Sequence, residues 1–444
     1  MRETVVLLSI PGLRERDVAV MPKLQSAVAG GEIADLTPTF PAVTCPVQAA
    51  MTTGRAPREH GVIANGFYWR DKHAVEMWTS PSDCIQRPQI WDLLRQRDKD
   101  RTSAVWFPLH SKLCPADYVC TPAPIHNPDG SESLWCYTRP EQLYGTLRDE
   151  LGHFPLHNFW GPMAGIGASQ WIADSAVHAA KTWRPNFFYI YLPHLDYAAQ
   201  RSGPDSAAAD QAVADLDELL GSLFERFRAA YGDDPLWLVA GEYAITPVRH
   251  ATYPNRVLRE AGLLAVREAD DGEHLDFEAS AAFAMVDHQF SHVFVKGADA
   301  QIVRRVADLF TGRPGIHEVV AGVQLAKYEL DHPRSGELVL ISTPDSWQAY
   351  PWWFDDARAP GFARTVDIHR KPGYDPVELH FDPAAKSIPL DATLVKGSHG
   401  APVREDYQRT VVLCSEPGLF PHHTRMRDVD VFGVIARELG IAPR

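Results

Sequence analysis

Short apolar runs recur along the chain and indicate buried strands. Most are bounded by Gly, Pro, Asp or Ser, and they are rich in β-branched or aromatic residues, which favours strands over helices. The predicted strands cover residues 4–10, 102–107, 186–192, 235–241, 291–297, 336–342 and 410–415. Because these runs are apolar throughout, they are typical of strands that are covered on both faces.

Between these runs, apolar residues return at helical spacing. This pattern predicts helices over residues 168–183, 206–232 and 301–312. The alternation of strands and helices predicts an α/β fold, with a mostly parallel central sheet covered by helices on both faces. Two regions rich in aromatic residues or proline, 108–165 and 343–395, fit the alternation poorly. We expect both to be excursions that cover the site of a single domain, residues 1–444.

The ends of the predicted strands carry the first candidates for chemistry, because ligands of open α/β sheets bind beyond the carboxyl ends of the strands. The residues just after three of the strands are Pro11, Asp196, Glu242 and Tyr243. The loop between the first and second strands, residues 36–65, is rich in threonine and leads into a short helix. We expect the site to form where these segments meet.

The length, composition and net charge restrict the class of protein and the kind of partner. The chain has 444 residues, of which 45% are apolar and 23% are charged, as in folded globular proteins. The formal net charge of -14 argues against a nucleic-acid polymer or an anionic membrane as the main partner. A small anionic substrate stays compatible, because a metal or a helix N-terminus can reverse the local field.

The N-terminus and the cysteines bear on the compartment. The first apolar run, Val5 to Ile10, is too short for the hydrophobic region of a secretory signal. No run approaches the roughly 18 apolar residues of a membrane span. The six cysteines form no CxxC pair and resemble no disulfide or zinc framework. We predict a cytoplasmic protein with reduced thiols and no membrane association.

The segment TCPVQAAMTTGRAPREHGVIAN resembles the nucleophile motif of the nucleotide pyrophosphatase/phosphodiesterase family, in the alkaline phosphatase superfamily. In that family a threonine precedes a helix that ends in Thr-Gly, followed by His-Gly and a later asparagine. Thr39 begins a Thr-Phe-Pro triplet that matches by letters. Thr44 matches by its spacing to Gly54, His60 and Asn65. Because a helix fixes that spacing, the resemblance implies Thr44 as nucleophile and Asn65 as the amide that holds the transferred group.

Later motifs match the same family in order. LPHLDYAAQRSGPD resembles its Asp-x-x-Gly-His motif, with Asp196 at the Asp. VAGEYAITPV resembles its Asp-His-Gly-Met motif, and RSGELVLIS resembles a strand common in the superfamily. KGSHG places His399 at the final metal-ligand histidine. The resemblance spans residues 5 to about 402 and implies an alkaline-phosphatase-like α/β/α sandwich.

The chain departs from the family at several metal ligands. Pro11 replaces the first-strand Asp, Gln200 replaces the second-motif His, and Glu242-Tyr243 replaces the Asp-His pair. In the family these ligands hold two zinc ions. The changes therefore bear directly on the cofactor.

The ligands that remain by position are Asp196, Glu242 and His399, with the Thr44 hydroxyl and the Gln200 amide as weaker additions. A catalytic zinc takes at least three ligands from protein, and neither inherited site keeps that number of strong ligands. An oxygen-rich set suits Mg²⁺ or Mn²⁺ better than Zn²⁺. We expect a divalent metal, Zn or Mg/Mn, with one ion or none in place of two.

Two further clusters offer replacement ligands, bases or phosphate-binding cations. The first holds Asp287, His288 and His292. The second holds Asp367 and His369, followed by Arg370, Lys371 and Asp375. Each has a plainer interpretation: hydrogen-bonded histidines beside a strand for the first, and a solvated turn for the second.

These motifs predict a metal-assisted hydrolase of a phosphodiester, phosphomonoester or phosphonate. In this hypothesis Thr44 attacks phosphorus to form a phospho-enzyme, and Asn65 with the Thr44 backbone N–H holds the oxyanion. Asp196, Glu242 and His399 bind metal or position water. Two alternatives stay open: a specialised enzyme of the same fold with a rewritten site, and an inactive relative that binds a ligand or partner in the same cleft. Thr44 as an ordinary helix N-cap is the plainer interpretation of that residue.

Overall fold

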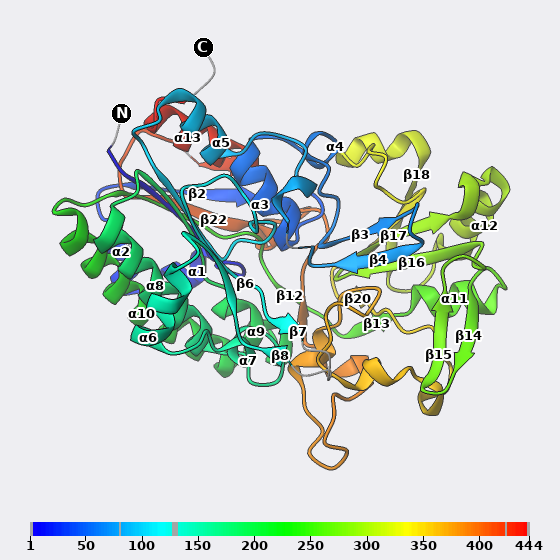
Figure 1. Ribbon diagram of the computed structural model, residues 1–444. Coiled ribbons are helices and arrows are strands. Elements are labelled where there is room, and N and C mark those ends of the chain that lie inside the picture. Colours follow the sequence, from blue (N-terminus) through cyan, green and yellow to red (C-terminus); the bar gives the residue numbers. More distant parts are fainter. Residues whose placement is uncertain (1–2, 80, 127–131, 422–423, 442–444) are drawn as a thin grey trace.

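The computed structural model describes residues 3–79, 81–126, 132–421 and 424–441 (Figure 1). Among them, nine strands form one large sheet. In spatial order they are β23 (Arg425–Arg427), β2 (Glu32–Thr37), β22 (Thr410–Cys414), β11 (Leu236–Ala240), β1 (Val5–Ser9), β10 (Phe187–Tyr191), β5 (Ser103–Trp106), β6 (Tyr118–Pro122) and β9 (Cys136–Arg139). β1 runs parallel to β10 and β11, so the carboxyl ends of these central strands lie together at one edge.

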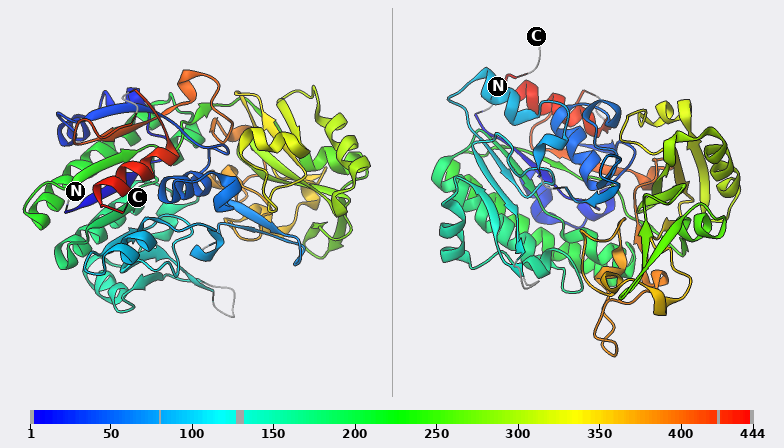
Figure 2. Two further views of the ribbon diagram at one scale, coloured as in Figure 1. Left: turned by 90° about the horizontal axis from the view of Figure 1, so that it is seen from above. Right: turned by 45° about the vertical axis from the view of Figure 1, so that its right-hand side comes forward.

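Helices cover both faces of this sheet (Figure 2). Val6 and Leu8 of β1 belong to the core on one face, and Val5 and Leu7 belong to the core on the other, as the period of a strand requires. On the first face lie α2 (Pro22–Ala27), α6 (Leu143–Leu151), α8 (Ile166–Trp183) and α10 (Ala207–Tyr231); on the second lie α3 (Thr44–Thr53), α5 (Ile90–Arg97) and α13 (Asp428–Glu438). The predicted α/β sandwich is confirmed.

A second, antiparallel sheet lies beside the first (Figures 1 and 2). Its strands are β16 (Ala282–Asp287), β17 (Phe290–Val295), β19 (Leu338–Ser342) and β18 (Ile316–Ala321), and α11 (Pro254–Glu260) and α12 (Ala300–Phe310) pack against it. The core of this sheet also contains Phe40, Val43 and Ile63 from the threonine-rich segment. Because the threonine-rich segment that leads into α3 packs in the core of the second sheet, we propose a single domain.

Short elements complete the described chain. The helices are α1 (Glu15–Val18), α4 (Pro57–His60), α7 (Leu156–Phe159) and α9 (His194–Ser202). The strand pairs are β3 (Gly66–Trp69) with β4 (Ala74–Met77), β7 (Ile125–His126) with β8 (Glu132–Ser133), β12 (Thr246–Pro247) with β21 (Gly397–Ser398), β13 (His250–Thr252) with β20 (Ser346–Gln348), and β14 (Ala265–Ala269) with β15 (Gly272–Asp276). The 3₁₀ helices are η1 (Ser82–Cys84), η2 (Lys296–Ala298), η3 (Gly322–Tyr328), η4 (Asp356–Arg358), η5 (Gly361–Arg364), η6 (Pro376–Leu379), η7 (Ala392–Leu394) and η8 (Asp406–Gln408).

The structure differs from the sequence-based expectation in three details. The predicted strands 291–297 and 336–342 lie in the second sheet, because an apolar run indicates burial but not which sheet is joined. The apolar pattern does not predict β2, since its partly exposed EIADLT sequence lacks a continuous apolar run. The region 108–165 supplies β6 and β9, so part of this excursion extends the large sheet. Within the described residues, no helix has the length and apolar character needed to cross a membrane.

Candidate active site

Helix α3 presents Thr44 at the carboxyl edge of the large sheet. The helix begins at Thr44, because Val43 is extended (φ -130°, ψ 160°) and takes the N-cap position. The Thr44 hydroxyl lies 3.0 Å from the Tyr243 hydroxyl, and both residues are buried. The hydroxyl therefore stands at the positive end of a helix dipole, an environment that favours an anionic group.

A chain of hydrogen bonds runs outward from Thr44. The Tyr243 hydroxyl donates to Asp196 Oδ1 over 3.4 Å, and the other oxygen of Asp196 accepts the Gln200 amide N–H over 2.8 Å. The Gln200 carbonyl oxygen accepts the Tyr374 hydroxyl over 2.8 Å. Burial raises the pKa of Asp196 to about 7, against the opposing effect of the Gln200 and Tyr243 hydrogen bonds. Two substituted family positions, Gln200 and Tyr243, thus belong to one network with Thr44.

Glu242 lies at the end of β11 and is fully buried. Its Oε1 accepts the Ser9 hydroxyl over 2.5 Å and the Gln48 amide N–H over 2.7 Å, whereas its Oε2 has no partner among the described residues. Burial raises the pKa of Glu242 to about 8. Ser9 ends the first strand and Gln48 lies one turn after Thr44 on α3, so this carboxyl group links α3 to the central strands.

His399 packs against Tyr243. The two rings are stacked with centroids 3.5 Å apart. His399 Nδ1 donates to the Ala42 carbonyl oxygen over 2.8 Å, which places the lone pair on Nε2. That Nε2 lies 3.9 Å from Asp196 Oδ1 and makes no hydrogen bond with a described residue. Burial holds the pKa of His399 well below its usual range, so the ring is neutral.

Four hydrogen bonds hold Asn65, one of them from the Trp78 backbone N–H to its carbonyl oxygen over 2.8 Å. Its Oδ1 accepts the Cys45 backbone N–H over 3.0 Å, and its Nδ2 donates to Asp287 Oδ1 over 3.1 Å. Its backbone N–H donates to Asp287 Oδ2 over 2.7 Å. Asp287 Oδ1 also accepts His288 Nδ1–H over 2.6 Å. The Asn65 amide, which is predicted to hold the transferred group, is thus hydrogen-bonded to Cys45, the residue that follows Thr44.

His288 brings the second sheet to the site. It follows β16 with a left-handed backbone (φ 60°), a conformation that costs a non-glycine residue about 1–2 kcal/mol. Its ring stacks on Tyr374 with centroids 3.6 Å apart and lies 3.8 Å from the His399 ring. The strained turn therefore places an imidazole among the residues of the candidate site.

The other predicted residues lie differently. His292 is buried within β17, where its Nε2 donates to the Ile63 carbonyl oxygen and its Nδ1 accepts the Gly336 N–H. Asp367 accepts the Arg370 backbone N–H and pairs with the Arg370 guanidinium, and His369 is exposed. Asp367 is thus joined to its own excursion, and His292 to the second sheet and to Ile63 of the threonine-rich segment; no hydrogen bond joins either side chain to Thr44 among the described residues.

Three residues of the network are not among the candidates from sequence: Ser9, Gln48 and Tyr374. Ser9 could have been found as the polar residue that ends the first strand. Gln48 could have been found as the residue one turn after Thr44 on the same helix. Tyr374 comes from the excursion 343–395, and no spacing rule connects it to the nucleophile.

The donor set does not fit the two-zinc site of the family. Among the described residues, no group of three or more His, Cys, Asp or Glu side chains is placed to hold a metal ion. The Tyr243 hydroxyl lies between Thr44 and Asp196, and its ring covers His399. The Gln200 amide directs an N–H, not a lone pair, at Asp196. Glu242 Oε2 and His399 Nε2 are two unpartnered atoms, fewer than the three protein ligands that a catalytic zinc takes.

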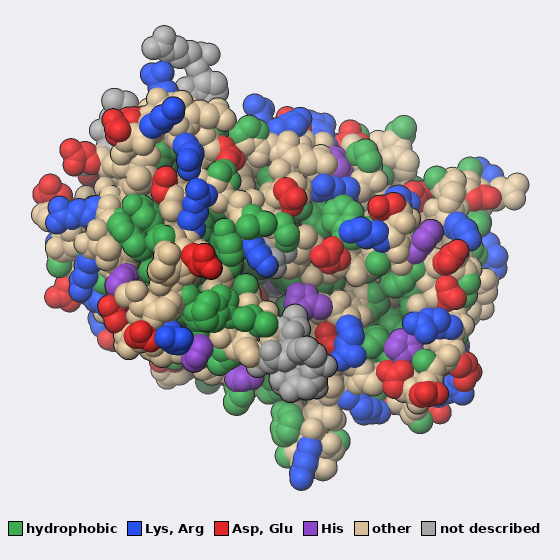
Figure 3. Space-filling model, in the orientation of Figure 1, with side chains coloured by type: hydrophobic (Ala, Val, Ile, Leu, Met, Phe, Trp, Pro, Cys, Tyr) green, Lys and Arg blue, Asp and Glu red, His purple; other side chains and the backbone are tan. Residues whose placement is uncertain are grey.

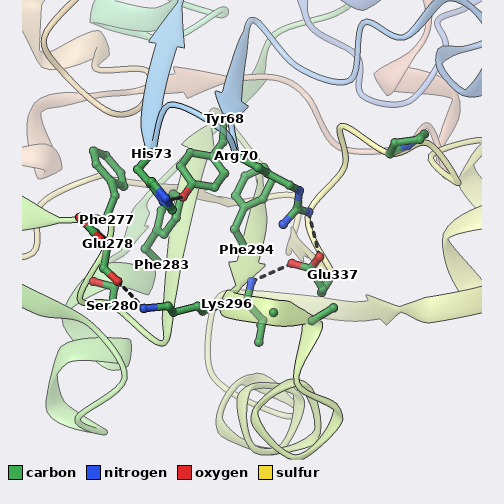
Figure 4. A pocket seen from close by; sticks show the side chains of 14 residues that line it. Tyr68, Arg70, His73, Phe277, Glu278, Ser280, Phe283, Phe294, Lys296 and Glu337 are labelled. Carbon is green, nitrogen blue, oxygen red and sulfur yellow. Dashed lines mark hydrogen bonds and ion pairs between the residues drawn. The ribbon is translucent and has the colours of Figure 1, made fainter.

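The site is closed, and an open pocket lies elsewhere, on the second sheet. Asp196, the most exposed of Thr44, Asn65, Asp196, Glu242 and His399, is 7% exposed. A pocket of about 440 Å³ opens on the second sheet between Tyr68, Phe283 and Lys296 (Figure 4). On the face in Figure 3, acidic and basic side chains are interspersed, without a uniform basic area for a polyanion.

The fold is shared with solved hydrolases. Phosphonoacetate hydrolase from Sinorhizobium meliloti 1021, solved with phosphonoformate, superposes with a TM-score of 0.64 at 15% identity, over 99% of this chain and 96% of that chain. Human ectonucleotide pyrophosphatase/phosphodiesterase 5 superposes with a TM-score of 0.63 at 13% identity, over the same shares. At this level of identity the likeness establishes the alkaline-phosphatase-like fold.

Sequence comparison gives the family. An uncharacterised pyrophosphatase/phosphodiesterase of Schizosaccharomyces pombe is 23% identical over 238 residues, which are 50% of this chain and 41% of that protein. The chain thus spans less than half the length of that relative. Residues 5–375, most of the chain, match the family described as type I phosphodiesterase/nucleotide pyrophosphatase. The chain therefore belongs to the type I phosphodiesterase/nucleotide pyrophosphatase family.

Proposed function

We propose that this chain hydrolyses a small phosphodiester, phosphomonoester or phosphonate, with Thr44 as the nucleophile. The observation that carries the proposal is the line of hydroxyls from Thr44 to Tyr243 to Asp196, with spacings of 3.0 and 3.4 Å. A threonine hydroxyl needs a base to become a nucleophile, and this line ends on a carboxylate. Family membership supports the same class of reaction.

The proposed reaction has two steps. In the first, Thr44 Oγ forms a bond to phosphorus and its proton passes to the Tyr243 oxygen, while the Tyr243 proton passes to Asp196. The bond from phosphorus to the leaving group breaks, and the leaving group takes a proton from solvent. In the second, the oxygen of a water molecule bonds to phosphorus and the Thr44–phosphorus bond breaks. Thr44 recovers its proton from Asp196 through Tyr243, and the proton released by water goes to solvent.

Fixed dipoles would stabilise the charge that develops on phosphorus. The Thr44 backbone N–H stands at the start of α3, and the Asn65 amide lies beside it, where its Oδ1 accepts the Cys45 N–H. Preorganised donors of this kind are often the largest electrostatic contribution to catalysis in a closed site. Because the donor set does not fit the family's zinc pair, the proposed steps use only groups of the protein.

The test compares Thr44→Ala with wild type on bis(4-nitrophenyl) phosphate, 4-nitrophenyl phosphate and phosphonoacetate. We expect turnover by the wild type on at least one of these compounds and its loss in Thr44→Ala. Thr39→Ala is the matched control, since Thr39 is equally buried, its hydroxyl has no partner among the described residues, and it is the competing threonine of the same segment. If Thr39→Ala lost turnover and Thr44→Ala kept it, the nucleophile would be Thr39 and not Thr44.

A second candidate function is ligand or partner binding by an inactive relative. The burial of the whole site favours it, because a substrate could reach Thr44 only after the cover moves. Equal inactivity of the wild type and Thr44→Ala on all three compounds, with both proteins folded, would favour this function over hydrolysis.

A further inference from the structure

Asp287 links the second sheet to the nucleophile segment. It ends β16 and is fully buried. Its two carboxylate oxygens hold the Asn65 backbone N–H at 2.7 Å and the Asn65 side-chain amide at 3.1 Å. Thus a residue far away in sequence fixes both the backbone and the side chain of Asn65.

These contacts determine which way the Asn65 amide points. The Cys45 backbone N–H can only donate, so it must face Asn65 Oδ1. Nδ2, the other end of the amide, therefore faces Asp287 Oδ1, which accepts its N–H. Both ends of the amide are therefore assigned by chemistry. One N–H of Nδ2 stays unused, because Asn65 makes no further side-chain hydrogen bond with a described residue.

We propose that Asp287 is a positioning residue, which holds Asn65 so that its unused N–H meets a phosphoryl oxygen of the substrate. The inference rests on the proposed function, because it takes a phosphoryl group as the partner of that N–H. A flipped amide would present its oxygen to the anion and repel it. Asp287 prevents the flip without contacting the substrate itself.

The test is a double-mutant cycle between Asp287→Asn and Asn65→Ala, with inorganic phosphate as the probe and calorimetry as the measurement. Asp287→Asn keeps the size of the side chain, but an NH₂ group replaces one of the two carboxylate oxygens. This NH₂ group then faces an N–H donor of Asn65. A lost hydrogen bond to a charged group corresponds to affinity about 10- to 100-fold weaker. We expect this loss from Asp287→Asn in the wild-type background, and less than about a twofold change in the Asn65→Ala background.

Asp217→Asn is the matched control. Asp217 is also a buried carboxylate that accepts two backbone N–H groups, from Lys23 and Leu24, but it lies on α10. The Asp217→Asn variant should have a lower melting temperature than the wild type but the same affinity for phosphate. This separates a general loss of stability from the positioning of Asn65.

The outcomes are distinct. Equal losses in both backgrounds, no loss in either, or no phosphate binding by the wild type would overturn the role of Asp287. The expected cycle, together with no Thr44-dependent turnover, would uphold the positioning of Asn65 and overturn the proposed hydrolysis instead.

Discussion

Tyr243 is the residue that most changes the chemistry expected of this family. Its hydroxyl lies between Thr44 and Asp196, and its ring stacks on His399. One side chain thus contacts three of the residues that the sequence motifs single out. In the proposed reaction this phenol replaces a metal ion as the group beside the nucleophile, and it acts by proton transfer instead of charge.

Removing the phenol oxygen tests this role. In Tyr243→Phe, Thr44 loses its hydrogen-bonded route to Asp196, and loss of general base catalysis typically costs a factor of about 10²–10⁴ in rate. We expect kcat to fall by that order with a smaller change in KM, measured by initial rates on the best compound. Tyr350→Phe is the control, since the Tyr350 hydroxyl is buried without a partner among the described residues. Unchanged kcat in Tyr243→Phe would contradict the proton route.

Metal removal tests whether the reaction proceeds without a metal ion, as the proposed proton route through Tyr243 requires. Because Gln200 and Tyr243 stand where the motif resemblance implies metal ligands, we expect activity to survive dialysis against EDTA. We also expect no gain from added Zn²⁺, Mg²⁺ or Mn²⁺. Elemental analysis of the purified protein, together with rates before and after dialysis, provides the measurement. Activity that vanishes with the chelator and returns with one of these ions would show that the protein uses a metal.

At the scale of elements, the end of α3 is fixed by the packing of α13. Gly54 is the C-cap of α3, with a left-handed backbone (φ 65°). A Cβ at this position would come within 2.6 Å of the Phe432 ring on α13. The residue therefore satisfies two requirements, a left-handed conformation and a close approach between two helices.

Gly54→Ala should be more destabilising than an ordinary left-handed glycine substitution. We expect it to lower the free energy of unfolding by more than Gly232→Ala, which carries only the conformational cost of about 1–2 kcal/mol. Gly232 caps α10 with φ 83°, and no described atom lies within 4 Å of the position that a Cβ would take there, so it isolates that cost. Urea unfolding of both variants measures the difference, and equal losses would show that the Phe432 ring moves aside without cost.

The start of α13 provides a pH-dependent contact with the nucleophile segment. Asp428 is fully buried and accepts the Thr39 backbone N–H over 2.7 Å. Burial raises its pKa to about 7. The folded protein therefore binds a proton that the unfolded chain releases near pH 4, so this residue's contribution to stability falls as the pH rises from about 4 to 7.

Asp428→Asn removes this dependence. Between pH 5 and pH 8 we expect the stability of the wild type to fall relative to Asp428→Asn, by up to about 3 kcal/mol. Urea unfolding of both proteins at the two pH values gives the difference, in which other titrating groups cancel. Parallel changes in the two proteins would contradict the raised pKa.

At the scale of the whole molecule, the large sheet and its helices were predictable, because continuous apolar runs and helical periods are local signals. The second sheet was not, since the runs 291–297 and 336–342 look the same in either sheet. The helix that begins at Thr44 and ends before Gly54 was readable, because its start and its C-cap glycine are local signals. The contacts of Asp287, His288 and Tyr374 were not, because they depend on how distant segments fold together.

The shared core has a consequence for how such proteins diverge. Val43 immediately precedes Thr44 and packs in the core of the second sheet, together with Phe40 and Ile63. A substitution deep in that sheet would therefore shift Thr44, the proposed nucleophile, although the substituted residue is far from it. Relatives could acquire new substrate preferences through substitutions of buried apolar residues in this sheet alone, while every residue of their sequence motifs stays the same.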